Sequence, residues 1–200
     1  MPKQLARYAV VVAMGALMSG CLYETTLDAN GGGTMSVMLR GINRKDLEGL
    51  KNKMQNRTVK VLSAEFSGES DNGQVVTKLQ FEDVTKLSTT EFFRNVSIKR
   101  SDGVEGSQVL TAIVRNAKPG DLSDAQIERL GKELKVVVTF PGDVIESNGT
   151  TGAPNTVTWT WGMKDFFKQS EVMMTAAYKP SAAAAAAPTA GPTAAVTPAT

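Results

Sequence analysis

The residue best suited to covalent chemistry in this chain is its single cysteine, Cys21. One cysteine forms no internal disulfide and no thiolate metal cluster. The sequence also has no histidine, which removes the commonest general base and the commonest protein metal ligand. We therefore expect a protein that is not an enzyme, with no catalytic residues, no metal site and no cofactor.

The segment before Cys21 has the three parts of a secretory signal. Lys3 and Arg7 precede an apolar run of eleven residues, 8–18, and a Ser-Gly pair follows. As a helix the run spans only about 16 Å, roughly half of a ~30 Å hydrocarbon core. We therefore predict that residues 1–20 are a signal peptide that is removed, and not a transmembrane helix.

The stretch LMSGC, which begins at Leu17 and ends at Cys21, resembles the bacterial lipobox. The resemblance implies that the Cys21 thiol receives a diacylglyceryl group, that the chain is cut before it, and that the new amino group is acylated. Two or more acyl chains hold a protein stably at a membrane, whereas one chain does so only marginally. The resemblance therefore predicts a cell-envelope lipoprotein whose membrane anchor is the lipid on Cys21.

Leu22 follows the cysteine. In the sorting rule that belongs to the lipobox resemblance, aspartate at this position favours the inner membrane. Leu22 therefore points to the periplasmic side of the outer membrane if the host is Gram-negative. The alternative location is the outer face of the plasma membrane.

Removal of residues 1–20 also changes the charge. The whole chain carries 22 basic and 20 acidic residues, and the loss of Lys3 and Arg7 leaves 20 of each. A neutral chain has no overall electrostatic attraction to polyanions. We therefore expect no nucleic acid partner.

The remainder divides into one folded domain, residues 21–180, and a tail, residues 181–200. The tail is rich in Ala, Pro and Thr and contains no charged and no aromatic residue. It lacks the apolar side chains of a core, and its prolines interrupt any helix. We predict that the tail is disordered.

Three segments of the domain alternate apolar and polar residues with the period of a β-strand. Their inward sets are Val75, Thr77, Leu79 and Phe81; Leu134, Val136, Val138 and Phe140; and Val157, Trp159 and Trp161. Turn sequences rich in Asn, Asp and Gly at 30–33, 70–73, 101–103 and 147–149 favour tight hairpins. The strands are therefore expected to pair mostly antiparallel.

Helical patterns interrupt these strands. Ser123 and Gln126 form a capping box before a segment that carries Ile127, Leu130 and Leu134 at helical spacing. Asn43 is suited to cap a helix over 43–54, and residues 83–95 contain a weaker helical pattern. We predict an α+β domain, a curved and mostly antiparallel sheet with two or three helices packed on it. The alternative is an immunoglobulin-like β-sandwich.

A PG-x-V-x-x-S-N-G turn followed by a V-x-W strand resembles the LppM-type bacterial lipoprotein domain, as does the opening GCLYETTLDANGGGTMSVML. The resemblance implies an α+β fold, binding of a lipid or glycolipid, and no catalytic residues. The matching positions are Pro141, Gly142, Val144, Ser147, Asn148, Gly149, Val157 and Trp159.

A cluster of basic residues lies between positions 40 and 60. Near a membrane, each such charge contributes about 1 kcal/mol of attraction to anionic lipid. The candidate contacts with anionic lipid are Arg44, Lys45, Lys51, Lys53 and Arg57. The alternative is that they form the solvated face of an ordinary amphipathic helix.

Six methionines follow Cys21, and their flexible side chains suit either the filling of core gaps or a pocket for an acyl chain. We therefore expect a non-catalytic module that binds a lipid, a glycolipid or an envelope partner. The alternative is a structural envelope lipoprotein that acts only through protein–protein contacts.

Overall fold

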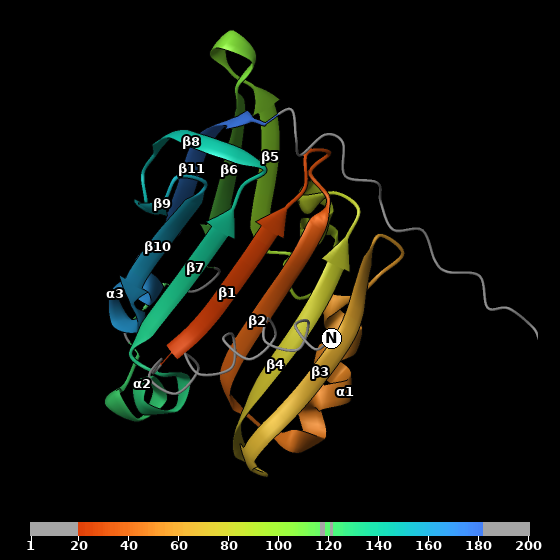
Figure 1. Cartoon of the computed structure of the whole chain (residues 1–200). Coiled ribbons are helices and arrows are strands. Elements are labelled where there is room, and N and C mark those ends of the chain that lie inside the picture. Colours follow the sequence, from red (N-terminus) through yellow and green to blue (C-terminus); the bar gives the residue numbers. More distant parts are fainter. Residues whose placement is uncertain (1–19, 117–118, 121, 182–200) are drawn as a thin grey trace, which may run out of the picture.

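The computed structural model describes residues 20–116, 119–120 and 122–181. Its strands are β1 Gly20–Leu27, β2 Gly33–Ile42, β3 Val59–Glu69, β4 Asn72–Phe81, β5 Val96–Asp102, β6 Gln108–Arg115, β7 Glu133–Thr139, β8 Gly142–Ser147, β9 Thr150–Ala153, β10 Thr156–Gly162 and β11 Glu171–Pro180. They form a seven-stranded sheet in the order β3-β4-β2-β1-β7-β10-β9 and a four-stranded sheet in the order β5-β6-β11-β8 (Figure 1).

Short helices connect the strands: the 3₁₀ helices η1 Arg44–Asp46, η2 Val84–Thr89 and η3 Val104–Gly106, and the α-helices α1 Leu47–Met54, α2 Asp124–Leu130 and α3 Met163–Lys168. The helix α1 packs on β3 and β4, and α3 packs on β7 and β10. The helices predicted around 43–54 and after Ser123 are confirmed, and the weaker pattern forms η2. The α+β class is confirmed.

The pairing is antiparallel in all described strand pairs except β1 with β7, which is parallel. The turn sequences at 30–33, 70–73 and 101–103 connect the antiparallel pairs β1 and β2, β3 and β4, and β5 and β6, as expected. The hairpin expected at 147–149 is wrong, because β8 and β9, which this turn connects, lie in different sheets. All strands that the structure describes lie within Gly20–Pro180. A chain that starts at Gly20 therefore contains every residue of these strands.

The helix after Ser123 is shorter than its apolar spacing predicted. It ends at Gly131, whose φ of 91° lies outside the helical region. Leu134 is consequently not on the helix, and it instead lies in β7 with its side chain buried. The predicted helical face of Ile127, Leu130 and Leu134 is therefore wrong at its last position.

The core lies between the two sheets. Fully buried side chains such as Val37, Leu79 and Val157 of the larger sheet pack in one cluster with Leu110 and Tyr178 of the smaller sheet. A second cluster around α3 consists of Leu134, Met163, Phe166 and Val172. Cys21, Tyr23, Val114 and Trp161 pack against both clusters.

Most of the predicted signal peptide, residues 1–19, and of the predicted tail, residues 182–200, lies outside the described residues. Gly20 is already the first residue of β1 and pairs with Glu133. None of the helices in the described part of the chain is long and apolar enough to cross a membrane.

Candidate functional site: an apolar cavity between the sheets

An apolar cavity of about 410 Å³ lies between the inner faces of the two sheets. This volume falls within the range of about 300–1,000 Å³ that is typical of small-molecule sites. Three of the six methionines, Met35, Met163 and Met174, line it and also pack in the core clusters. Other lining side chains include Tyr23, Val136, Trp159, Ile98, Leu110, Ala112, Val114, Leu87, Phe93 and Phe166.

One end of the space between the sheets is closed by hydrogen bonds. The Arg100 guanidinium on β5 donates from Nη1 to the Asn30 carbonyl (2.6 Å) and from Nη2 to Gln108 Oε1 (2.8 Å). The same Oε1 accepts the hydroxyl proton of Tyr178 (2.8 Å), and burial raises the pKa of that tyrosine. Gly31 has a φ of 88°, which favours glycine, and a Cβ there would lie 1.6 Å from Arg100 Nη1 and displace the guanidinium.

The opposite end carries a polar rim. Asn95, Arg115 and Asn116 line the cavity where β5 begins and β6 ends. The Arg115 amide donates to the Asn95 carbonyl (2.9 Å), and Arg115 Nε pairs with Glu171 (3.2 Å). Asn116 Nδ2 donates to the carbonyl of Phe166 (2.9 Å), which joins the rim to α3. We call these three residues the rim.

Cys21 lies at the same end of the cavity as the rim. Its side chain lines the cavity together with Tyr23 and Thr25, the alternate residues of β1. It packs with Val114 on the cluster around α3, and the carbonyl of Phe166 in that cluster accepts a hydrogen bond from the rim residue Asn116.

The Cys21 thiol donates to the Leu130 carbonyl, with Sγ and the oxygen 3.8 Å apart. Burial raises the pKa of the Cys21 thiol, and the nearby Arg40 lowers it to a smaller extent. Burial also raises the pKa of Tyr23.

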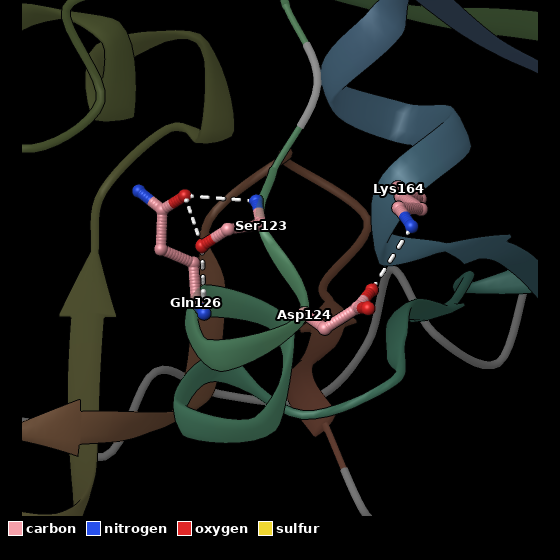
Figure 2. A network of polar contacts seen from close by, with 4 residues as sticks. All are labelled: Ser123, Asp124, Gln126 and Lys164. Atoms are coloured by element: carbon pink, nitrogen blue, oxygen red, sulfur yellow. Dashed lines mark hydrogen bonds and ion pairs between the residues drawn. The ribbon is translucent and has the colours of Figure 1, made fainter.

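The position of Leu130 depends on α2, and the predicted capping box at the start of this helix is confirmed (Figure 2). The Gln126 amide donates to Ser123 Oγ (3.3 Å), and the Ser123 amide donates to Gln126 Oε1 (2.9 Å). Lys164 Nζ on α3 pairs with Asp124 on α2 (3.1 Å). These contacts place the last residue of α2 over Cys21.

The five candidate basic residues lie on one short segment, on η1, on α1 and just after it. Lys51 pairs with Glu48 (2.9 Å), Lys53 pairs with Glu91 (3.4 Å), and the Arg44 guanidinium lies 4.7 Å from the centre of the Phe66 ring. Lys45 and Arg57 are exposed. Because β2 runs antiparallel to β1 with Met38 opposite Leu22, the segment after β2 starts at the end of the sheet where Cys21 lies, with Arg44 and Lys45 nearest to that end (Figure 1). Arg57 lies at the other end of the sheet, because Val59 and Gly33 both pair with Phe81.

The S-N-G turn after β8 is held by one side chain. Asn148 Oδ1 accepts from Trp159 Nε1 (2.8 Å) and from the Thr175 amide (2.8 Å), and Asn148 Nδ2 donates to the Met173 carbonyl (2.9 Å). The next residue, Gly149, is so close to β10 that a Cβ would lie 2.6 Å from Val157 Cγ1. These contacts give a physical reason for the S-N-G and V-x-W residues to occur together.

The cavity has no sequence motif of its own, and only the methionines and the inward alternation predicted for the segments of β7 and β10 pointed toward it. No group of three or more His, Cys, Asp and Glu side chains that could hold a metal ion occurs among the described residues. The arrangement offers an apolar interior, a polar rim and a thiol beside that rim.

The fold and the cavity define an α+β domain with an interior space for an apolar group. The model of the LppM domain matches residues 34–178, and the chain belongs to this family of lipoprotein domains. The NMR structure of the folded domain of Mycobacterium tuberculosis LppM is similar to this chain, with a TM-score of 0.48 and 13% identity over 82% of this chain and 90% of that chain. No match was found among curated protein sequences.

Proposed function

We propose that this chain is a membrane-anchored lipoprotein of the cell envelope whose domain binds an acyl chain of a lipid or glycolipid in the cavity between its sheets. The single observation that carries the proposal is the 410 Å³ cavity with an almost entirely apolar wall. Membership of a lipoprotein family supports a location in the cell envelope. The proposed role is that of a binding module and not of an enzyme.

The distribution of polar groups favours an amphiphilic ligand. An acyl chain in the interior removes apolar surface from water on both the chain and the wall, which is the main favourable term in such binding. Methionine side chains adapt to chains of different shape. The rim presents the Asn95 side chain and the Arg115 guanidinium to a head group, whereas the Asn116 amide already donates to the carbonyls of Phe166 and Gln169. Arginine is the residue type that best binds phosphate.

The cavity itself is tested with a matched pair of variants on β6. Ala112 lines the cavity, whereas its neighbour Thr111 lies on the opposite face of the strand. Native mass spectrometry of the chain from Gly20 onward, purified from a bacterial host, should detect bound lipid. Ala112→Phe should lower the lipid-bound fraction about tenfold, and Thr111→Phe should leave it unchanged.

Equal lipid occupancy of the two variants would contradict the proposal. So would a wild-type chain that is always empty and that binds no apolar probe. Those results would favour the alternative of a structural envelope lipoprotein that acts through protein contacts.

The anchor is tested in cells with the whole chain. Cys21→Ser should abolish incorporation of radiolabelled palmitate and leave the uncut precursor, because Ser offers no thiol for the diacylglyceryl group. Unchanged labelling would refute lipidation at Cys21. In a Gram-negative host, fractionation then tests the finer proposal that Leu22 directs the protein to the outer membrane, against an inner-membrane location.

The basic segment supports a second contact with the membrane, because it starts at the end of the sheet that carries the anchor. Arg44→Glu combined with Lys45→Glu, both on η1 directly after β2, should weaken binding to vesicles that contain phosphatidylglycerol at least about tenfold, since each near-surface charge contributes about 1 kcal/mol. The control is Lys99→Glu with Lys179→Glu, an equal charge change on the four-stranded sheet. Equal losses in both pairs would assign the effect to net charge, and the segment would then be only a solvated face.

A further inference from the structure

The sulfur of Cys21 is part of the cavity wall. Cys21, Tyr23 and Thr25 point to the inner face of β1, and the thiol also contacts the Leu130 carbonyl at 3.8 Å. A group attached to Sγ would therefore start inside the boundary of the cavity, beside the rim, and not on the outer surface of the domain.

The strand that carries Cys21 restricts where such a group can go. β1 is an interior strand, with Leu22 opposite Met38 of β2 and Cys21 opposite Leu134 of β7. If the substituent pointed away from the cavity, the first residues of β1 would have to separate from β2 and β7. Their backbone N–H and C=O groups would then lose their hydrogen-bond partners. A substituent that enters the cavity leaves both pairings intact.

The volume of the cavity is sufficient for one acyl chain. A methylene group and a water molecule are of similar size, and a water molecule has a share of about 30 Å³ in the liquid. The 410 Å³ cavity therefore holds roughly 14 such groups, which corresponds to one acyl chain and not two. The wall suits this occupant because its side chains are mainly aliphatic, aromatic and methionine.

We propose that one acyl chain of the lipid on Cys21 itself occupies the cavity when the domain is away from the bilayer. The proposal rests on the lipidation of Cys21 proposed above. A tethered chain has an effective concentration in the millimolar range. The anchor consequently competes with free lipid, and the cavity becomes available to a ligand when all acyl chains of the anchor are in the membrane.

The test uses the chain from Gly20 onward, in which Cys21 is the only cysteine. The thiol is alkylated in urea with N-methylmaleimide, N-octylmaleimide or N-dodecylmaleimide, and the chain is then refolded. Binding of the fluorescent probe N-phenyl-1-naphthylamine is measured. The methyl adduct should bind the probe as the free thiol does, and the dodecyl adduct should bind it at least about tenfold more weakly. The octyl adduct should lie between them.

The matched control moves the same chain to the outer face of the strand. Glu24 is exposed and lies on the face of β1 opposite Cys21. In a Cys21→Ser, Glu24→Cys chain, the dodecyl adduct should leave probe binding unchanged. The melting temperature should rise with chain length for adducts at position 21 and not for adducts at position 24.

Unchanged probe affinity of the position-21 dodecyl adduct would overturn the inference. A melting temperature that falls with chain length at position 21 would also overturn it, because it would show that the substituent displaces β1. Either result would leave the proposed lipid binding intact, because that function is read separately from the lipid-bound fraction of the unmodified chain. Failure of palmitate labelling in cells would instead refute the anchor.

Discussion

At the scale of single residues, Asn148 joins three segments through its side-chain amide. It links its own turn to Trp159 on β10 and to the backbone on both sides of Met174 on β11. Trp159 is 5% exposed and lines the cavity, so its indole N–H has little access to water. Asn148 thus fixes one wall of the cavity although it does not line it.

Replacement of this amide should destabilise the fold. Asn148→Ala removes three hydrogen bonds and leaves the Trp159 N–H without its partner, which typically costs about 1–3 kcal/mol. The free energy of unfolding in urea measures the loss. Asn52→Ala on the exposed side of α1 is the control, and an equal loss in both variants would contradict the role of Asn148.

The Cys21 thiol, in the unlipidated chain, should show its raised pKa in its reactivity. Burial favours the neutral thiol, so the unfolded chain ionises at lower pH than the folded chain. The ratio of iodoacetamide labelling rates, unfolded over folded, should therefore fall as the pH rises from 9.0, the ordinary thiol pKa, to about 11. Because the ordinary thiol pKa is 9.0, the unfolded thiol is at least half ionised in that range, while the folded thiol still gains most of its thiolate. The free energy of unfolding should fall over the same rise in pH. The neutral thiol contributes fully to stability below the ordinary thiol pKa, and this contribution declines above it.

A cysteine on the outer face of β1 provides the control for this measurement. In the Cys21→Ser, Glu24→Cys chain the labelling ratio should stay constant over the same pH range. A constant ratio at Cys21 would show that its thiol has an ordinary pKa and is protected only by steric burial.

At the scale of elements, α2 and α3 together support the end of the cavity where Cys21 lies. The capping box at Ser123 satisfies backbone donors at the start of α2, whereas the Lys164–Asp124 pair is largely exposed. These two interactions differ in strength, because exposed ion pairs contribute little and helix caps contribute more.

Ser123→Ala should lower the free energy of unfolding by about 1 kcal/mol. Lys164→Ala should lower it by less than about 0.5 kcal/mol, because solvent screens the pair. Urea denaturation of both variants at the same ionic strength makes the comparison. A larger effect from Lys164→Ala would show that the contact between α2 and α3, and not the cap, holds this end.

At the scale of the whole molecule, the two sheets are joined at the end opposite Cys21 by Arg100. Its guanidinium spans from the β1–β2 turn to Gln108, which also binds Tyr178. The molecule therefore has a closed end with charge-assisted hydrogen bonds and another end that carries the rim and Cys21.

Arg100→Ala should lower the free energy of unfolding by about 1.5–3 kcal/mol, the range for hydrogen bonds to charged groups. Lys99 is the adjacent, exposed residue of β5, and Lys99→Ala should have little effect. Thermal and urea unfolding of the two variants provide the measurement. Equal stability of both would mean that the core alone holds the sheets together at this end.

Local patterns in the sequence determined a large part of this fold. Alternation in β4, β7 and β10, the Asn/Asp-Gly turns, the Ser123–Gln126 box and the α+β class follow from near neighbours along the chain. The family was recognisable for the same reason, because its motif is a turn followed by a strand. The resemblance of the residues before Cys21 to a lipobox is likewise a local signal, and its prediction of a lipid anchor rests on sequence alone.

Only the tertiary structure decided how the strands are divided between two sheets, since alternation reports which face is buried and not which strand is the neighbour. The parallel pairing of β1 with β7 joins residues more than one hundred positions apart, and it places Cys21 beside Leu134. The cavity, its closed end at Arg100 and the position of the thiol in its wall all arise from such distant contacts. No local pattern encodes them, because each depends on side chains that meet only when the two sheets pack face to face.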